Sequence, residues 1–287
     1  SGHGVGGFRF RCAVMAPHTV IGPPGPLHLP RWSELWEARE VLWRFGQRDI
    51  LLRYRQTLIG VAWVILQPIV TAGVFALVFG RVAQLPTGGI PYFLFGYVGT
   101  LLWTVFASTV NRAAGSLVSN QALVSKVFFP RLLVPLSTCV SVLVDFLVAL
   151  VIGFGLLWWF GVWPGWAILT IPVWVTLCVA LAMGIGLAAA AIMVRYRDIA
   201  YVLPWAVQTL LYASPVAYSL EAVPDAVRPY LLANPLTWVL EGMRWAMLGS
   251  AAPPVWQIVG AVVVSGLVLF AGLLVFQRYE REFADLI

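Results

Sequence analysis

Residues 132–160 read LLVPLSTCVSVLVDFLVALVIGFGLLWWF, a long apolar run that holds a single charged residue, Asp145. An α-helix rises about 1.5 Å per residue, so about 20 apolar residues cross the ~30 Å hydrocarbon core of a bilayer. This run exceeds that length. It therefore predicts a membrane-spanning helix.

Segments of the same kind lie on both sides of it. The whole chain is 61% apolar and 10% charged, whereas soluble domains carry about 25% charged residues. We therefore predict an all-α integral membrane protein whose residues 57–287 form six transmembrane helices. Besides residues 132–160, the predicted spans are Leu58–Gly80, Ile90–Val110, Trp166–Val194, Ile199–Ser219 and Val255–Phe276.

The residues before the first span divide into two parts. Residues 1–30 are rich in Gly and Pro without periodicity, and we expect a disordered leader or a remnant of cloning, with Met15 as a candidate start. Residues 31–56 are predicted to form an amphipathic helix. Its Trp32, Trp36 and Trp43 share one face, which suits a helix lying in the lipid headgroup layer. A packed soluble helix is the alternative.

The basic residues predict the orientation, because cytoplasmic loops of membrane proteins are enriched in Arg and Lys. With the amino terminus inside, the predicted inner connections carry most of the basic residues, and only Arg81, Arg228 and Arg244 fall outside. We therefore expect a multi-pass protein of a bacterial cytoplasmic (inner) membrane with both termini in the cytoplasm. The same bias accounts for the net charge of +6 and gives no support for nucleic acid as a partner.

The composition excludes several kinds of site. Lys126 is the only lysine, and it follows a serine, so the chain contains no Walker A phosphate loop. The histidines all precede the first span, and the three cysteines are far apart, so we expect neither a metal site nor a disulfide framework.

Two connections are too long for simple turns. The inner one, Asn111–Arg131, is predicted to contain a short amphipathic helix at about residues 115–130. The outer one, at about residues 220–254, is apolar but repeatedly broken by proline. It is predicted to form short re-entrant or interfacial helices, protected by protein or by a water-lined cavity.

Short sequences in a fixed order carry a resemblance to a known family. RDILLRYRQT at 48–57 and LIGVAWVILQP at 58–68 resemble the first signature of ABC-2 type exporter permeases, in particular those that export O-antigen, teichoic acid and related lipid-linked polysaccharides. Further similar elements follow in order through the rest of the chain: residues 116–130, VRYRD at 194–198, Ser214-Pro215, Asn234-Pro235, EGMRW at 241–245 and FADLI at 283–287.

The resemblance implies a transport subunit and not an enzyme. It implies that two copies of a separate nucleotide-binding ATPase subunit hold the ATP and Mg, so that this chain has no catalytic residue and no cofactor. Six spans are few for a wide conduit, so we expect a homodimer with the channel at its two-fold interface. The helix at about 115–130 would be the coupling helix that docks on the ATPase, although an ordinary loop is the alternative. Its contact residues would be Leu117, Asn120, Gln121, Leu123, Val124, Lys126 and Phe128.

The resemblance also implies a cargo, an undecaprenyl-diphosphate-linked polysaccharide. Arginine binds phosphate through a planar fork of donors, so Arg48, Arg53 and Arg55 are candidates for gathering the pyrophosphate at the cytoplasmic entry. Simple attraction to anionic membrane lipid is the alternative.

Aromatic side chains are candidates for a glycan passage, because sugar rings stack on aromatic faces. An interfacial aromatic belt is the alternative. The candidates are Tyr97 and Trp103 in the second predicted span and Trp205, Tyr212 and Tyr218 in the fifth.

Three ionisable residues remain. A carboxylate at bilayer depth is costly, so Asp145 is predicted to face a partner in the interior. Glu241 and Arg244 are three residues apart and are predicted to form a structural pair or a gate latch.

Other functions stay open at this point. An ABC-2 permease for drugs or small lipids would have the same fold. A membrane-embedded polyprenyl glycosyl- or phosphotransferase would need several grouped acidic residues, which this sequence lacks.

Overall fold

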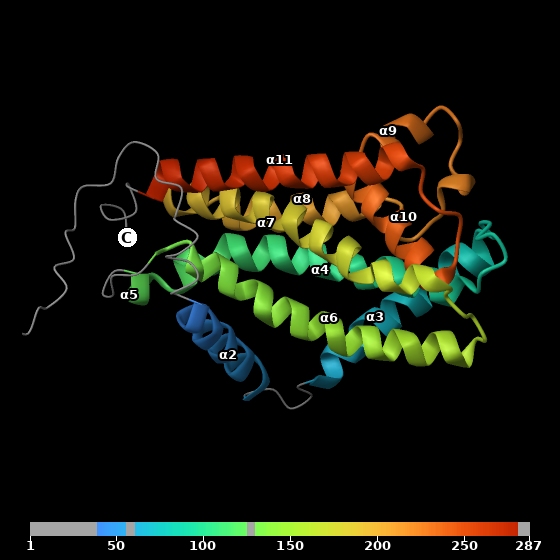
Figure 1. Cartoon of the computed structure of the whole chain (residues 1–287), viewed down its shortest axis with the longest axis horizontal. Helices are drawn as coiled ribbons and strands as arrows, with labels where there is room; N and C mark the ends of the chain where they lie inside the picture. Colours follow the sequence, from blue (N-terminus) through green and yellow to red (C-terminus); the bar gives the residue numbers. More distant parts are fainter. Residues whose placement is uncertain (1–38, 56–60, 125–129, 281–287) are drawn as a thin grey trace, which may run out of the picture.

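The computed structural model describes residues 39–55, 61–124 and 130–280. These residues form helices, turns and no strand, which confirms the predicted all-α fold. Five helices are long and apolar enough to cross a membrane, and they extend along the long axis of the molecule (Figure 1). They are α3 (Val61–Phe75) with its π-helical continuation η1 (Ala76–Val82), α4 (Tyr92–Ser119), α6 (Leu133–Trp159), η2 (Trp166–Thr170) with α7 (Ile171–Arg195), and α11 (Val255–Glu280).

Shorter elements lie at the two ends of this bundle. One end of the bundle holds α2, α5 and the last turn of α11, and the opposite end holds the connection before α10 (Figure 1). We call them the inner end and the outer end, after the orientation predicted from the basic residues. The short elements are α2 (Arg39–Arg55), α5 (Gln121–Val124), α8 (Ile199–Tyr212), η3 (Leu220–Ala222), α9 (Arg228–Leu232) and α10 (Pro235–Leu248).

Helix α4, the second of the spanning helices, is the centre of the bundle. It packs against α3, α6, α7, α8 and α10. Of the residues in its most apolar stretch, 78% are buried, compared with 11% for α3 with η1 and 17% for α11. The apolar outer faces of α3 and α11 are therefore left for lipid or for another chain.

The tightest helix pair is α7 with α11, and it depends on glycine. A Cβ placed on Gly272 would lie 2.1 Å from the carbonyl oxygen of Gly184, and a Cβ on Gly184 would lie 2.4 Å from the carbonyl oxygen of Val268. Small residues let membrane helices approach closely, which replaces the hydrophobic effect that lipid does not supply.

The predicted span Ile199–Ser219 differs from the prediction. Its helix, α8, ends at Tyr212 after 14 residues, about 21 Å at 1.5 Å per residue. The chain then turns through Ser214–Tyr218, because Pro215 lacks the N–H group that a continuing helix needs. The six-helix count is therefore not confirmed, since the described residues contain five spanning helices.

The inner connection also differs. Helix α4 does not end at Val110 but continues to Ser119, because Ala113, Ala114 and Leu117 are fully buried against neighbouring helices. Only the four residues of α5 form a separate helix in the described part of the connection. The predicted helix at about 115–130 therefore starts later than expected, and its residues 125–129 lie outside the described residues.

Candidate functional site

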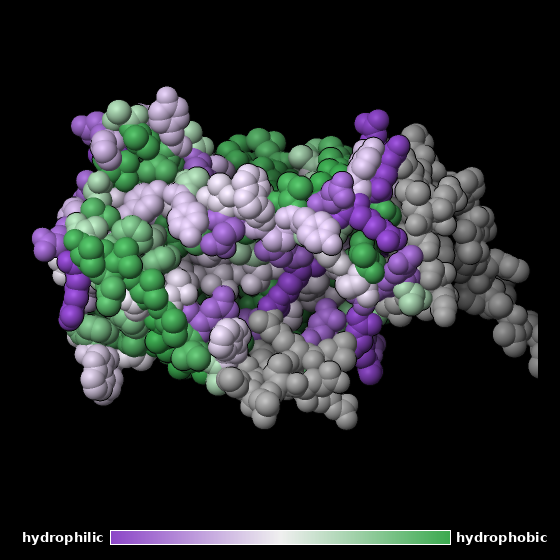
Figure 2. Space-filling view, turned by 180° about the vertical axis from the view of Figure 1, so that it is seen from behind, coloured by the Kyte–Doolittle hydropathy of each residue, from purple (hydrophilic) through white to green (hydrophobic). Residues whose placement is uncertain are grey.

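One face of α4 is open and polar. Between Thr104 and Gly115 its half-buried positions follow helical spacing along a single side, and all of them are small or polar. We call this face the α4 strip: Thr104, Ala107, Ser108, Asn111, Arg112 and Gly115. Figure 2 shows hydrophilic side chains in a recessed area near the middle of the molecule.

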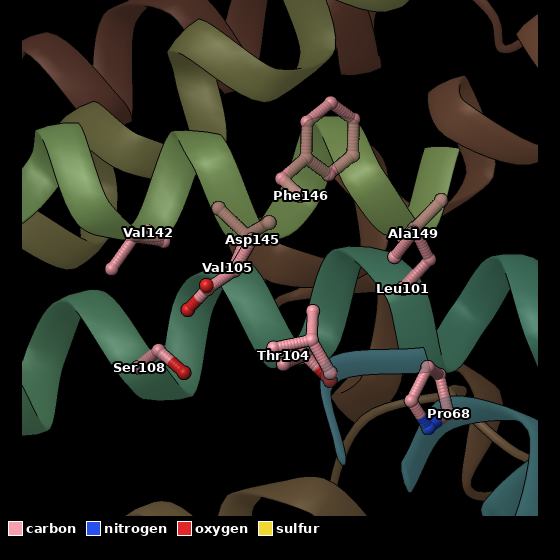
Figure 3. Close-up of a pocket in the computed structure, with 10 residues that line it drawn as sticks. Pro68, Leu101, Thr104, Val105, Ser108, Val142, Asp145, Phe146 and Ala149 are labelled. Carbon is pink, nitrogen blue, oxygen red and sulfur yellow. The ribbon is translucent and has the colours of Figure 1, made fainter. Parts of the chain in front are cut away.

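A small pocket adjoins the α4 strip. It has a volume of about 30 Å³ and lies between α3, α4 and α6, enough for about two water molecules. Figure 3 shows the Asp145 carboxylate pointing from α6 into this pocket, toward Ser108 of α4. On the α3 side the pocket is lined by Pro68, which leaves the carbonyl of Val64 without its helical donor. Polar side chains from α4 and α6 therefore meet at this point.

The buried acid has a basic partner that the sequence analysis missed. Nη2 of Arg112 donates to Oδ2 of Asp145 at 2.8 Å, and Nη1 of Arg112 donates to Oγ of Ser141 at 2.9 Å. Arg112 had been assigned to a cytoplasmic loop, but the extension of α4 places it opposite α6. The pair joins the two helices and neutralises a carboxylate at membrane depth.

Asp145→Ala is expected to lower the free energy of unfolding by about 3 kcal/mol, because it leaves the Arg112 cation without its anion. That value is at the low end of the range for broken buried pairs, since the Asp145 and Arg112 side chains are 12% and 24% exposed. Unfolding in mixed detergent micelles measures the loss. The double variant Arg112→Gln with Asp145→Asn should lose less stability than the sum of the losses in Arg112→Gln alone and Asp145→Asn alone. Strict additivity of these losses would mean that the pair contributes nothing to stability.

The exposed side of α8 carries aromatic rings. Tyr201, Trp205 and Tyr212 share one helical face and are 83%, 69% and 68% exposed. Gln208 lies on the same face. The hydroxyl of Tyr218 donates to the carbonyl of Tyr212 at 3.1 Å, which holds that ring near the end of the helix. We call Tyr201, Trp205, Gln208 and Tyr212 the α8 face.

Two predicted passage residues are not on an open surface. Tyr97 is fully buried, and its hydroxyl donates to the carbonyl of Ala149 at 2.7 Å. Trp103 is 8% exposed and packs against Phe106. These positions contradict the prediction that the two side chains line a passage. Both lie on α4 faces that other helices cover.

At the outer end, Arg244 fastens the turn after α8. Its side chain is 1% exposed, and Nη2 donates to the carbonyls of Pro215 and Val216 at 2.5 and 2.9 Å. Nη1 donates to Oε1 of Glu241 at 2.7 Å. The cation also lies 3.9 Å from the centroid of the Phe95 ring. The predicted pair with Glu241 is therefore present, and Arg244 additionally binds carbonyls that the broken helix leaves unpaired.

Other contacts hold the same turn from α4 and α10. The hydroxyl of Tyr92 donates to the carbonyl of Ala217 at 2.6 Å. Asn234 caps α10 by accepting from the Leu236 amide at 3.0 Å, and its Nδ2 donates to Oγ of Ser214 at 2.9 Å. A side chain at Gly99 would collide with the Val216 carbonyl, at 2.3 Å from a Cβ. The turn is therefore fixed against both helices.

At the inner end, Arg48 contacts the α4–α5 junction. Its Nη2 donates to Oδ1 of Asn120 and lies 3.4 Å from Oδ1 of Asp49. Arg48, predicted to bind the pyrophosphate, and Asn120, predicted to contact the ATPase, are thus brought together although they are 72 residues apart in the sequence. Arg53 and Arg55 belong to α2 by their backbone, but their side chains lie outside the described residues.

The remaining predicted coupling residues differ in their exposure, and some of them lie outside the described residues. Leu117 is fully buried within α4, so it is unavailable as a contact on the surface. Gln121 is exposed in α5. The side chains of Leu123 and Val124, and all of Lys126 and Phe128, lie outside the described residues. Among the described residues, no group of three His, Cys, Asp or Glu side chains is placed to hold a metal ion.

The comparisons with known proteins agree on one family. The ABC-2 type transporter family matches residues 40–248. The O-antigen export system permease protein RfbA of Myxococcus xanthus is 28% identical over 254 residues, covering 88% of this chain and 97% of the relative.

Two further relatives have similar coverage. The RfbA protein of Klebsiella pneumoniae is 24% identical, over 84% of this chain and 92% of its own length. The polysialic acid transport protein KpsM of Escherichia coli is 26% identical, over 82% of this chain and 91% of its own length.

Proposed function

Since this chain belongs to the ABC-2 type transporter family, we propose that it is the membrane-spanning permease of an ABC exporter for a polysaccharide carried on undecaprenyl diphosphate, an O-antigen or a similar glycan. The cargo is inferred from the relatives, which are named for export of O-antigen and transport of polysialic acid.

The observation that carries this proposal is the α4 strip. A polar face on a membrane helix is unfavourable against lipid, and such faces line water-filled cavities or other protein. In this chain the face includes Thr104, Ser108, Asn111 and Arg112, and each of these residues is half-buried. Hydroxyl and amide groups both donate and accept hydrogen bonds, which suits a cargo rich in hydroxyls.

A single open strip is half of an enclosed passage. We therefore expect a homodimer in which a second copy closes the strip, with the passage on the two-fold axis. The small buried fraction of α3, 11%, leaves an apolar face for such a contact. The exposed rings of the α8 face would offer stacking surfaces to sugars near this passage.

The energy would come from two ATPase subunits that hold the ATP and Mg. The sequence has no Walker A motif, and the exposed Gln121 of α5 stands at the inner end, where such a partner would dock. Both α2 and the last turn of α11 lie at that end (Figure 1). This arrangement fits a cytoplasmic amino terminus and a cytoplasmic carboxyl terminus in the inner membrane. Arg48, Arg53 and Arg55 remain candidates for the lipid pyrophosphate.

The test is export in a reconstituted system. The chain and its ATPase are placed in inverted vesicles with polyprenyl-diphosphate-linked glycan, and ATP-dependent entry of glycan into the lumen is measured. Trp205→Ala and Tyr212→Ala should each lower glycan entry severalfold, because they remove stacking surface from the α8 face.

The matched control is Trp158→Ala, which removes a ring that is 70% exposed at the end of another helix, α6. It should leave export near the wild-type rate, whereas an equal loss in all three variants would indicate only an interfacial aromatic belt. ATP-driven movement of a short lipid or drug without movement of glycan would replace the proposed cargo with the alternative one.

A further inference from the structure

A contact at the inner end joins two segments that the proposed function treats separately. Helix α2 carries the candidate lipid-binding arginines, and α5 opens the segment expected to contact the ATPase. The side chains of Arg48 and Asn120 meet between them. This inference rests on the proposed function, because it concerns how the two activities of the permease are linked.

The acceptor in this contact is held in one orientation. Asn120 follows the last residue of α4, and its Nδ2 donates to the Ser116 carbonyl at 2.9 Å and to Oγ of Ser119 at 3.3 Å. Both donations direct the amide nitrogen toward α4. The remaining group, Oδ1, is the one that accepts from Arg48. The next residue, Gln121, begins α5.

The donor is also held. Helix α2 packs on α6, and Gly46 allows a close approach, because a Cβ there would lie 2.8 Å from Cβ of Val140. Arg48 follows two residues later, and its guanidinium is 5.5 Å from the centroid of the Phe45 ring. Asp49 lies beside the same nitrogen at 3.4 Å. Arg48 and Asn120 therefore form a side-chain contact between α2 and the residue that precedes α5.

We propose that Arg48 is a positioning residue that ties the amphipathic helix α2 to the coupling segment through Asn120, so that the lipid-facing helix and the ATPase-facing segment move together. In this role Arg48 acts on transport through Asn120, and Arg53 and Arg55 are left as the candidates for direct contact with the lipid pyrophosphate. Hydrogen bonds to a charged donor are stronger than neutral ones and have a defined direction, as a mechanical link of this kind requires.

The sequence offers a matched control for the charge. Arg44 lies one helical turn earlier on α2, its side chain is 73% exposed, and its ion pair is with Glu40 on the same helix. Arg44→Gln and Arg48→Gln remove the same charge from the same surface helix. A role limited to attracting anionic lipid predicts similar effects of the two variants, whereas the link predicts an effect of Arg48→Gln alone.

The experiment measures glycan moved per ATP hydrolysed by the full permease–ATPase complex in proteoliposomes containing polyprenyl-diphosphate-linked glycan. Because the ratio is taken per assembled complex, it is independent of expression level. Arg48→Gln and Asn120→Ala should each lower it severalfold, and the double variant should be no worse than either one. Arg44→Gln should stay near wild type, because the ion pair of Arg44 with Glu40 lies within α2.

Three results would overturn the link. These are a wild-type ratio for either Arg48→Gln or Asn120→Ala, an equal loss in Arg44→Gln and Arg48→Gln, and additive losses in the double variant. Failure of the proposed function looks different, because the wild-type complex itself would then show no ATP-driven movement of glycan.

Discussion

Arg244→Ala is expected to cause the largest loss of stability among single substitutions at the outer end. The variant leaves the carbonyls of Pro215 and Val216 without their donor and Glu241 without its cation, all close to α4. Removing one partner of a buried ion pair costs about 3–5 kcal/mol. We expect little monodisperse protein after detergent extraction and almost no export.

Two comparisons make this prediction specific. Arg228→Ala removes a charge from an exposed position in the same connection and should leave both yield and export unchanged. Arg244→Lys keeps the charge but lacks the planar fork that reaches two carbonyls and Glu241 together, so an intermediate loss is expected. Normal yield and export of Arg244→Ala would show that the turn after α8 is held by other contacts.

Gly272→Ala is expected to be similarly damaging, although it adds only one methyl group. The added Cβ would lie 2.1 Å from the carbonyl oxygen of Gly184, and the neighbouring atoms are backbone, so the two helices must move apart. Overpacking of this kind costs about 1–3 kcal/mol where side chains can adjust, and rigid backbone leaves less room for adjustment. Unfolding in mixed micelles should show a clear loss of stability.

The same helix contains the control for this substitution. No atom lies within 4 Å of the position that a Cβ on Gly266 would take, so Gly266→Ala should be neutral or slightly stabilising, because alanine has the higher helix propensity. If Gly272→Ala were as stable as Gly266→Ala, the close approach of α7 and α11 would be wrong.

The spanning helices could be predicted from the sequence, because length and hydropathy report directly on the cost of burying a segment in lipid. Helix α8 could not be predicted in the same way. Its apolar composition continues past Tyr212, and the break depends on Pro215 together with Arg244, which lies 29 residues further along the chain. Hydropathy contains no information on where freed carbonyls find a distant donor.

The candidate site was only partly predictable for a similar reason. Asp145 is predicted to have a partner, but the sequence did not identify Arg112. The apolar segment ends at Val110, whereas helix α4 continues to Ser119 and includes Arg112. Tyr97 and Trp103 were predicted to line a passage because they are aromatic, yet neighbouring helices cover the faces of α4 that carry them. Which face of a membrane helix is covered depends on packing partners that a single sequence does not reveal.

The α4 strip has a consequence for the range of cargo. Its uncharged members are threonine, alanine, serine, asparagine and glycine, and none of them is large enough to form a shaped cavity for one particular sugar. Such a wall would treat chemically different repeat units nearly alike. Under the proposed function, recognition would then fall to the lipid carrier at the entry, which different glycans share, and one exporter would accept polymers with different building blocks.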